Sequence, residues 1–299
     1  MLAASGLIRY WNAMTVDPFV PTTSVQSGSE PDCPERSFSH SAIWADLRET
    51  RKLLGLGIAL GWLDIKLRYR GSVLGPFWLT VVSSLMVVSM GGLYSTLFHM
   101  NLTTYLPFLA VSLMLWQAGI AAQVQDSCGC FIEAEAMIRA SRLPLPLFAV
   151  RVVVRNVIIF AHNIVVPLGV FAFYHAWPGV AALWALPAAA LWVIDGWALC
   201  LLLGALCARY RDIPPIVGAL MQVVFYVTPI IWAPVQLHGY ARFLLLNPFY
   251  AVIEILRQPL LGQRPDTVLW EIALGASVLL CGAAALVYSK ARARVVFWM

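Results

Sequence analysis

Three long stretches of the chain contain no Asp, Glu, Lys or Arg side chain. They run from Arg70 to Asp126, from Arg155 to Asp195 and from Asp212 to Arg242. Only 12% of the 299 residues are charged and 61% are hydrophobic, whereas about 25% of the residues of a soluble domain carry charge. Each stretch has room for one or two bilayer-spanning helices of about 20 apolar residues. The sequence therefore predicts an all-α integral membrane protein.

The apolar residues divide into six predicted transmembrane helices, each with few or no charged side chains. The predicted spans are Phe77–Phe98, Tyr105–Val124, Asn156–Tyr174, Val180–Leu206, Ile216–Trp232 and Val268–Tyr288. We therefore expect a transmembrane domain over residues 73–299.

The first 72 residues differ in composition from the rest of the chain. Residues 1–40 are rich in Ser, Thr, Pro and Gly, which predicts a disordered tail. In residues 41–72, apolar side chains recur at intervals of three, four or seven between charged ones. That pattern predicts an amphipathic helix in the membrane interface, bent near Gly55, Gly57 and Gly61.

The positive residues indicate the orientation of the predicted spans. Short loops that stay in the cytoplasm carry most of the Lys and Arg of a membrane protein. Only Arg242, Arg257 and Arg264 fall in the predicted outer segments, which leaves 17 of the 20 positive residues on the inner side. Both termini are therefore expected in the cytoplasm. The net charge of +5 is explained by this topology, and no nucleic-acid partner is expected.

Two short apolar pieces lie in the outer segment before the last span. Four prolines, Pro234, Pro248, Pro259 and Pro265, interrupt residues 233–267, which contain the two pieces Tyr240–Leu246 and Phe249–Leu261. Each piece is too short to cross the bilayer. Apolar segments of this length are typical of short re-entrant or interfacial helices, which protein must bury wherever they reach membrane depth.

A long inner loop from Asp126 to Arg151 holds a segment of strong helix formers, FIEAEAMIRAS (Phe131–Ser141), which ends before Pro144. The segment predicts a short helix that stands off the membrane. Such a helix either docks in a groove of a soluble partner or is a plain surface helix.

Several aromatic residues fall within or at the ends of the predicted spans. Most aromatic side chains of a membrane protein belong to the interfacial belts or the core. Stacked aromatic faces also hold sugar rings through contact with the C–H face of the ring. The candidates for lining a substrate channel are Tyr94, Trp116, Phe225, Tyr226 and Trp232.

Several motifs together resemble the permease subunits of type-two ABC exporters, especially those that export O-antigen, capsule and teichoic acid. The run IKLRYRGSVLGPFWLT (Ile65–Thr80) is similar to the segment that opens their first span. In the same order follow MIRASRLPLPLFAVRVVVR after span two, ARYRDI after span four, and VTPIIW with NPFY around span five. The resemblance covers the chain from about Ile43 to the C-terminus, so residues 73–299 are expected to form the permease domain.

The resemblance implies a homodimer in the bacterial inner membrane, with a channel on its two-fold axis for a lipid-linked polysaccharide. ATP and Mg²⁺ would bind to a separate dimer of ATPase subunits, and this chain is expected to hold no cofactor or metal and to act as a transport subunit, not an enzyme. The sequence agrees, because it contains no G-x-x-x-x-G-K-[ST] phosphate-binding loop.

The resemblance also implies roles for charged residues on the inner side. The inner-loop helix would be the coupling helix seated in the ATPase, with Glu133, Glu135, Arg139 and Ser141 as candidate contacts. Arg68 and Arg70 are candidates for meeting the pyrophosphate of the substrate where it enters. Their alternative role is to anchor the helix to the anionic headgroups of membrane lipids.

Asp195 lies well inside the fourth predicted span, where a carboxylate is costly unless it is paired or faces water. It is a candidate for binding glycan hydroxyls from the channel wall. The alternative is that a neighbouring helix satisfies it.

Other functions fit the same composition. The first alternative is an ABC exporter of a lipid or a drug. The second is a membrane-embedded glycosyltransferase, although the sequence has no D-x-D motif and no His followed four or five residues later by an acid. The third is a structural membrane scaffold, which leaves Asp195 unexplained.

Overall fold

The computed structural model describes residues 40–72, 75, 77–97, 99–141, 143–234, 241–292 and 294–298. The predicted tail over residues 1–40 lies outside this part of the chain, except for its last residue. Within the described residues every regular element is a helix, which confirms the predicted all-α fold.

Among the residues that the structure describes, five continuous helical runs are long and apolar enough to cross a bilayer. Many of their large side chains point outward: Phe173 and Leu279 expose 77% and 76% of their surface. Such exposure suits lipid as the solvent. The runs are α4 (Phe77–Leu97), α5 (Leu102–Met114) with η1 (Leu115–Ala121) and α6 (Ala122–Gly129), α8 (Leu145–Asn163) with α9 (Val165–Tyr174), η2 (Gly179–Trp184) with α10 (Ala185–Arg209), and α13 (Thr267–Ala291).

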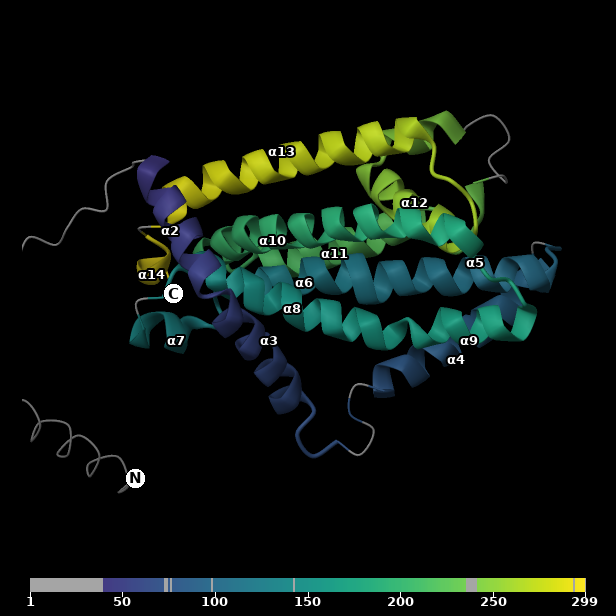
Figure 1. Cartoon of the computed structure of the whole chain (residues 1–299), viewed down its shortest axis with the longest axis horizontal. Coiled ribbons are helices and arrows are strands. Elements are labelled where there is room, and N and C mark those ends of the chain that lie inside the picture. Colours follow the sequence, from purple (N-terminus) through teal and green to yellow (C-terminus); the bar gives the residue numbers. More distant parts are fainter. Residues whose placement is uncertain are drawn as a thin grey trace, which may run out of the picture. The chain divides into compact units, whose positions relative to one another are not determined.

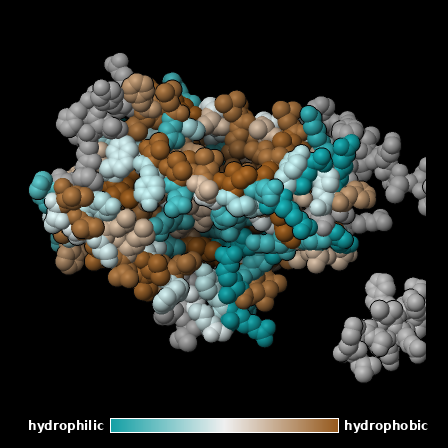
Figure 2. All heavy atoms as spheres, turned by 180° about the vertical axis from the view of Figure 1, so that it is seen from behind, coloured by the Kyte–Doolittle hydropathy of each residue, from teal (hydrophilic) through white to brown (hydrophobic). Residues whose placement is uncertain are grey.

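The long helices run side by side, and α10 packs against both α6 and α13 (Figure 1). The opposite face of the molecule, in Figure 2, carries hydrophobic side chains over much of its middle. Hydrophilic side chains gather there toward the end that holds α2 (His40–Lys52), α3 (Leu54–Arg68) and the short helix α7 (Glu135–Ala140). A bilayer would therefore surround the middle of the helices.

The fifth predicted span, Ile216–Trp232, is shorter in the structure than expected. Its helix, α11, runs from Ile213 to Val227. Fifteen residues at 1.5 Å per residue reach about 22 Å, less than the roughly 30 Å hydrocarbon core. Residues 228–232 leave the helix because Pro229 cannot donate a backbone hydrogen bond and Thr228 is extended. The described part of the chain thus has five full-length candidate spans and one short apolar helix.

The third predicted span starts too late. It was expected from Asn156, but α8 begins at Leu145, so the inner loop is shorter than predicted. Arg151 and Arg155, which marked the expected loop, lie within the helix. Their charges do not end the helix because carboxylates of other elements pair with both.

The interfacial helix consists of two helices that meet at Leu53, so the bend does not lie at the glycines. The reason is that Gly57 and Gly61 are buried against α8. A Cβ at Gly61 would lie 2.7 Å from the carbonyl oxygen of Arg151, and one at Gly57 would lie 3.0 Å from side-chain atoms of Leu147. These glycines therefore allow a close approach of α3 to α8.

The outer segment folds into two short helices, as predicted. They are η4 (Ala241–Leu246) and α12 (Pro248–Leu260), and Tyr240 lies outside the described residues. Asn247 caps α12 by accepting a hydrogen bond from the backbone N–H of Phe249 at 3.0 Å. Helix α12 packs against α5, α10 and α13, and Ala251, Ile253 and Ile255 are fully buried. Protein therefore surrounds much of this helix.

Candidate functional site

An open groove lies between α4, α11 and the run η1–α6. It has a volume of about 470 Å³ and combines aromatic rings with three glutamine side chains. Part of its wall is η1, a stretch of π-helix, a form that occurs often at functional sites. We call it the aromatic groove; its residues are Met86, Trp116, Gln117, Ala121, Gln125, Gly218, Met221, Gln222, Phe225 and Tyr226.

The rings of the groove are in contact with one another. The centroids of Trp116 and Phe225 lie 5.9 Å apart, and those of Phe225 and Tyr226 lie 5.2 Å apart. Trp116 is buried and also meets Phe249 of α12 at 6.2 Å, which fixes its ring. Tyr226 exposes 64% of its surface. The set offers a supported aromatic surface with a free outer ring, suitable for stacking on an apolar ring face.

The glutamines of the groove were not among the predicted site residues. Gln117, Gln125 and Gln222 bring amide donors and acceptors beside the rings. The Gln117 amide nitrogen lies 2.8 Å from the sulfur of Met86. Gln117 and Gln222 are uncharged polar residues inside predicted apolar spans, which is costly in lipid unless they face protein or water, and this is the sequence signal that points to them. Gln125 lies one residue beyond the second predicted span.

The other predicted channel residues, Tyr94, Trp232 and Asp195, do not line the aromatic groove. Tyr94 packs against the main apolar core. Trp232 follows α11 and donates a hydrogen bond from Nε1 to the carbonyl oxygen of Tyr226 at 3.3 Å, which places it next to the groove. Asp195 lies in a different cavity, between α10 and α13, where Oδ2 accepts a hydrogen bond from Ser277 Oγ at 2.8 Å.

Three side chains hold the extended segment that follows α11. Tyr105 donates to the carbonyl oxygen of Ile231 at 2.6 Å, and Asn247 donates to Thr228 Oγ1 at 2.9 Å. Arg257 of α12 donates to the carbonyl oxygen of Pro229 at 2.5 Å. The bonds from Tyr105 and Arg257 satisfy backbone carbonyls that left the helix, as non-helical backbone at membrane depth requires, and the bond from Asn247 holds the Thr228 side chain.

Arg257 is fully buried and its charge is compensated on every side. It pairs with Glu254, donates to Ser112 Oγ at 3.0 Å and lies 4.5 Å from the centre of the Phe108 ring. A buried charge is tolerated only with such partners. Arg257 therefore joins α5, α12 and the end of α11.

At the other end of the helices, five charged residues form one network. Arg151 binds both oxygens of Asp64 at 2.6 and 2.7 Å. Arg155, which is only 3% exposed, lies 3.0 Å from Asp126, 3.2 Å from Glu133 and 3.6 Å from Asp64. We call this the ionic network; it joins α3, α6 and α8 to the turn that precedes α7.

The predicted coupling residues divide between this network and the surface. Glu133 belongs to the ionic network. Glu135 and Arg139 form an exposed pair on α7 at 2.8 Å, and Ser141 Oγ donates to the carbonyl oxygen of Met137 at 2.6 Å just after the helix. The exposed pair leaves one face of α7 open to solvent or to a partner.

Arg68 and Arg70 are both exposed where α3 ends. Tyr69 between them is partly buried, and burial, with a smaller contribution from Asp126, raises the pKa of its hydroxyl. The two guanidinium groups are therefore available for phosphate oxygens, whether of a substrate or of lipid headgroups.

The chain is 24% identical over 250 residues to the O-antigen export system permease protein RfbA of Myxococcus xanthus, covering 82% of this chain and 96% of that protein. It is 25% identical over 171 residues to a protein of the same name from Klebsiella pneumoniae, covering 57% of this chain and 66% of that protein. No protein-family model matches the chain.

This chain is related to O-antigen export permeases. The match to the M. xanthus permease spans nearly all of that protein, so the relationship concerns a whole permease and not one motif. A multi-pass helical membrane protein is the fold that such a transport subunit requires. The predicted resemblance to these export permeases is confirmed.

Proposed function

We propose that this permease moves a lipid-linked, O-antigen-like polysaccharide from the cytoplasm across the bacterial inner membrane. Its relatives carry the name of O-antigen export permeases, which supports the substrate class. The observation that carries the proposal is the aromatic groove, where the rings of Trp116, Phe225 and Tyr226 lie beside three glutamines. Rings for stacking and amides for hydroxyl groups are the chemistry that sugars require.

The groove would serve as one half of a channel. Because α4, η1 and α11 leave it open on one side, a second copy of the permease placed against that side would complete the wall. We therefore propose that the permease is a homodimer and that the polysaccharide passes along its two-fold axis. A sliding chain is held well by stacking, since an aromatic face accepts successive sugar rings without fixing one register.

The energy would come from a separate dimer of ATPase subunits that binds ATP and Mg²⁺. This sequence contains no phosphate-binding loop. In the proposal, α7 docks into the ATPase through its open face, and the ionic network passes its movement to α3 and α8. The inner position of both termini is part of the proposal, supported by the bias of Lys and Arg toward that side.

The experiment is to delete the gene and to measure polysaccharide at the cell surface. Loss of surface polysaccharide, restored by the wild-type gene, is the expected result. Purified permease reconstituted with its ATPase should transport a lipid-linked glycan only when ATP is present. Unchanged surface polysaccharide in the deletion strain, or transport by the permease alone, would contradict the proposal. Restored export of a lipid or drug instead would favour the alternative cargo.

A further inference from the structure

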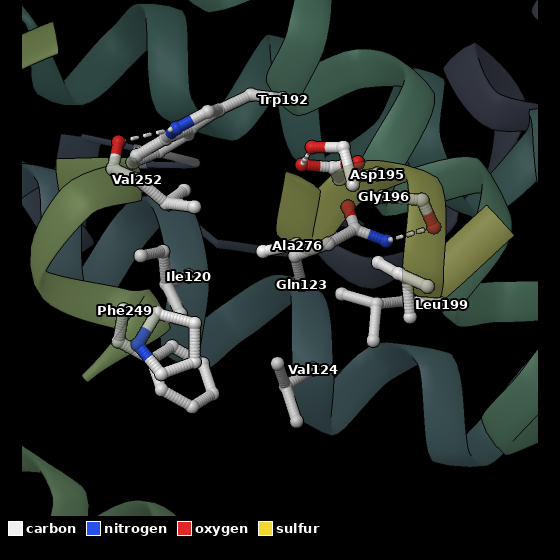
Figure 3. Close-up of a pocket in the computed structure, with 14 residues that line it drawn as sticks. Ile120, Gln123, Val124, Trp192, Asp195, Gly196, Leu199, Phe249, Val252 and Ala276 are labelled. Atoms are coloured by element: carbon white, nitrogen blue, oxygen red, sulfur yellow. Dashed lines mark hydrogen bonds between the residues drawn. The ribbon is translucent and has the colours of Figure 1, made fainter. Parts of the chain in front are cut away.

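A second cavity lies inside the subunit and shares no residue with the aromatic groove. It measures about 240 Å³ and lies among η1, α6, α10, α12 and α13 (Figure 3). Aliphatic and aromatic side chains form most of its wall, including Ile120, Trp192, Leu199 and Phe249. We call it the Asp195 cavity.

Asp195 is the only charged residue that lines this cavity among the described residues. It is 9% exposed, its Oδ2 accepts a hydrogen bond from Ser277, and its Oδ1 has no hydrogen-bond partner. None of the ion pairs in the described part of the chain includes it. A carboxylate in the middle of a spanning helix is costly without a partner, so this position lacks a compensating group.

The other polar groups of the cavity are already occupied. Gln123 donates to the carbonyl oxygen of Gly196 at 3.2 Å (Figure 3) and also accepts from Asn156 at 3.0 Å. The indole nitrogen of Trp192 donates to the carbonyl oxygen of Val252 at 2.9 Å, which fixes the ring at the cavity wall (Figure 3). The cavity therefore offers one vacant acceptor, on Asp195, within an apolar and aromatic wall.

We propose that the Asp195 cavity binds a lipophilic amine, with its protonated nitrogen on Asp195 and its apolar body against Trp192 and Phe249. The ammonium supplies both the missing positive charge and the missing hydrogen-bond donor. Aromatic rings beside a carboxylate add attraction for a cation. This site goes beyond glycan transport and does not depend on it, because its residues are separate from the aromatic groove.

The test compares two small molecules of the same shape on the full chain in lipid nanodiscs. The probes are 4-phenylbutylamine and 4-phenylbutan-1-ol, and empty nanodiscs correct for partition into lipid. Saturable binding of each is measured by equilibrium dialysis. We expect the amine to bind about tenfold or more tightly than the alcohol, since a hydrogen bond to a charged group is worth more than a neutral one.

Two variants test whether the probes bind in the Asp195 cavity. Asp195→Asn should bring the two affinities to within about twofold, because the amide keeps the shape and loses the charge. Ala276→Phe should abolish saturable binding of both probes by filling the cavity that Ala276 lines. Ala285→Phe, on an exposed position of the same helix, is the matched control and should bind as wild type does.

The comparison of amine and alcohol affinity in the wild-type chain tests the proposal even if a variant fails to fold. Equal affinity for the amine and the alcohol, or no saturable binding of the amine, would overturn the proposal. So would a tenfold preference that persists in Asp195→Asn, or binding unaffected by Ala276→Phe. If the cavity normally holds a lipid tail, it should bind the amine and the alcohol equally well, which would also contradict the proposal.

Discussion

Arg155 shows how a single buried charge in this permease depends on partners from other helices. Its guanidinium faces three carboxylates from α3, α6 and the turn before α7. Arg151 supplies the second positive charge through Asp64. The sequence predicted that both arginines lie in a loop on the inner side. Neither their burial nor their partners follow from spacing along the chain, since Asp64 and Arg151 lie far apart in sequence.

Replacing Arg155 by Gln should strongly destabilise the permease. The change removes the buried cation that faces Asp126 and Asp64, whose side chains are only 19% and 13% exposed, and breaking a buried pair costs about 3–5 kcal/mol. The apparent unfolding temperature in nanodiscs should fall by several degrees. Arg139→Gln, which breaks the exposed pair with Glu135, is the control and should cost under about 1 kcal/mol. Equal shifts in both variants would contradict the assigned burial of Arg155.

Removing the outer ring of the aromatic groove should weaken export without unfolding the protein. Tyr226 is exposed, so Tyr226→Ala loses little packing. Loss of one stacking surface, worth about 0.5–1.5 kcal/mol, should lower the export rate by about two- to thirteenfold. Val223→Ala, an exposed position on α11 outside the groove, should export at the wild-type rate. Export by Tyr226→Ala that matches this control would argue against sugar contact in the groove.

At the scale of elements, close helix packing depends on glycines whose purpose the sequence does not reveal. Glycines in a predicted amphipathic helix suggested a bend, yet the break lies at Leu53 and Gly61 contacts the backbone of α8. Likewise, α8 extends through two arginines because other elements neutralise them. In contrast, α12 begins where the sequence indicates, since Asn247 caps it and Pro248 fits its first turn.

Adding one methyl group at Gly61 should separate α3 from α8. In Gly61→Ala the new Cβ would lie 2.7 Å from the carbonyl oxygen of Arg151, and overpacking of this kind costs about 1–3 kcal/mol. The unfolding temperature should fall. Gly55→Ala lies on the same helix with no atom within 4 Å, so it should be neutral or stabilise by up to about 1 kcal/mol. A loss of stability that is the same in both variants would show that space against α8 is not the cause.

At the scale of the whole molecule, the predicted topology can be tested with two single cysteines. His175 and Lys290 are both exposed, near opposite ends of spanning helices. An impermeant maleimide added to intact cells should label His175→Cys from the outside, and Lys290→Cys only after the membrane is opened. The parent protein, whose described cysteines are mostly buried, measures the background. Labelling of both positions from the same side would refute the topology and the transport direction proposed with it.

The sequence by itself determined that this chain is a helical membrane protein, because long uncharged stretches have lipid as their only favourable solvent. It also indicated the relationship to O-antigen export permeases, through motifs spread along the chain. The tertiary structure decided which polar residues meet. It gathered Trp116, Gln222 and Tyr226 in one groove, placed Asp195 in another cavity and joined Arg155 to three acids. Hydrophobicity fixes which segments enter the membrane, whereas the rotation and contacts of each helix depend on neighbours distant in sequence.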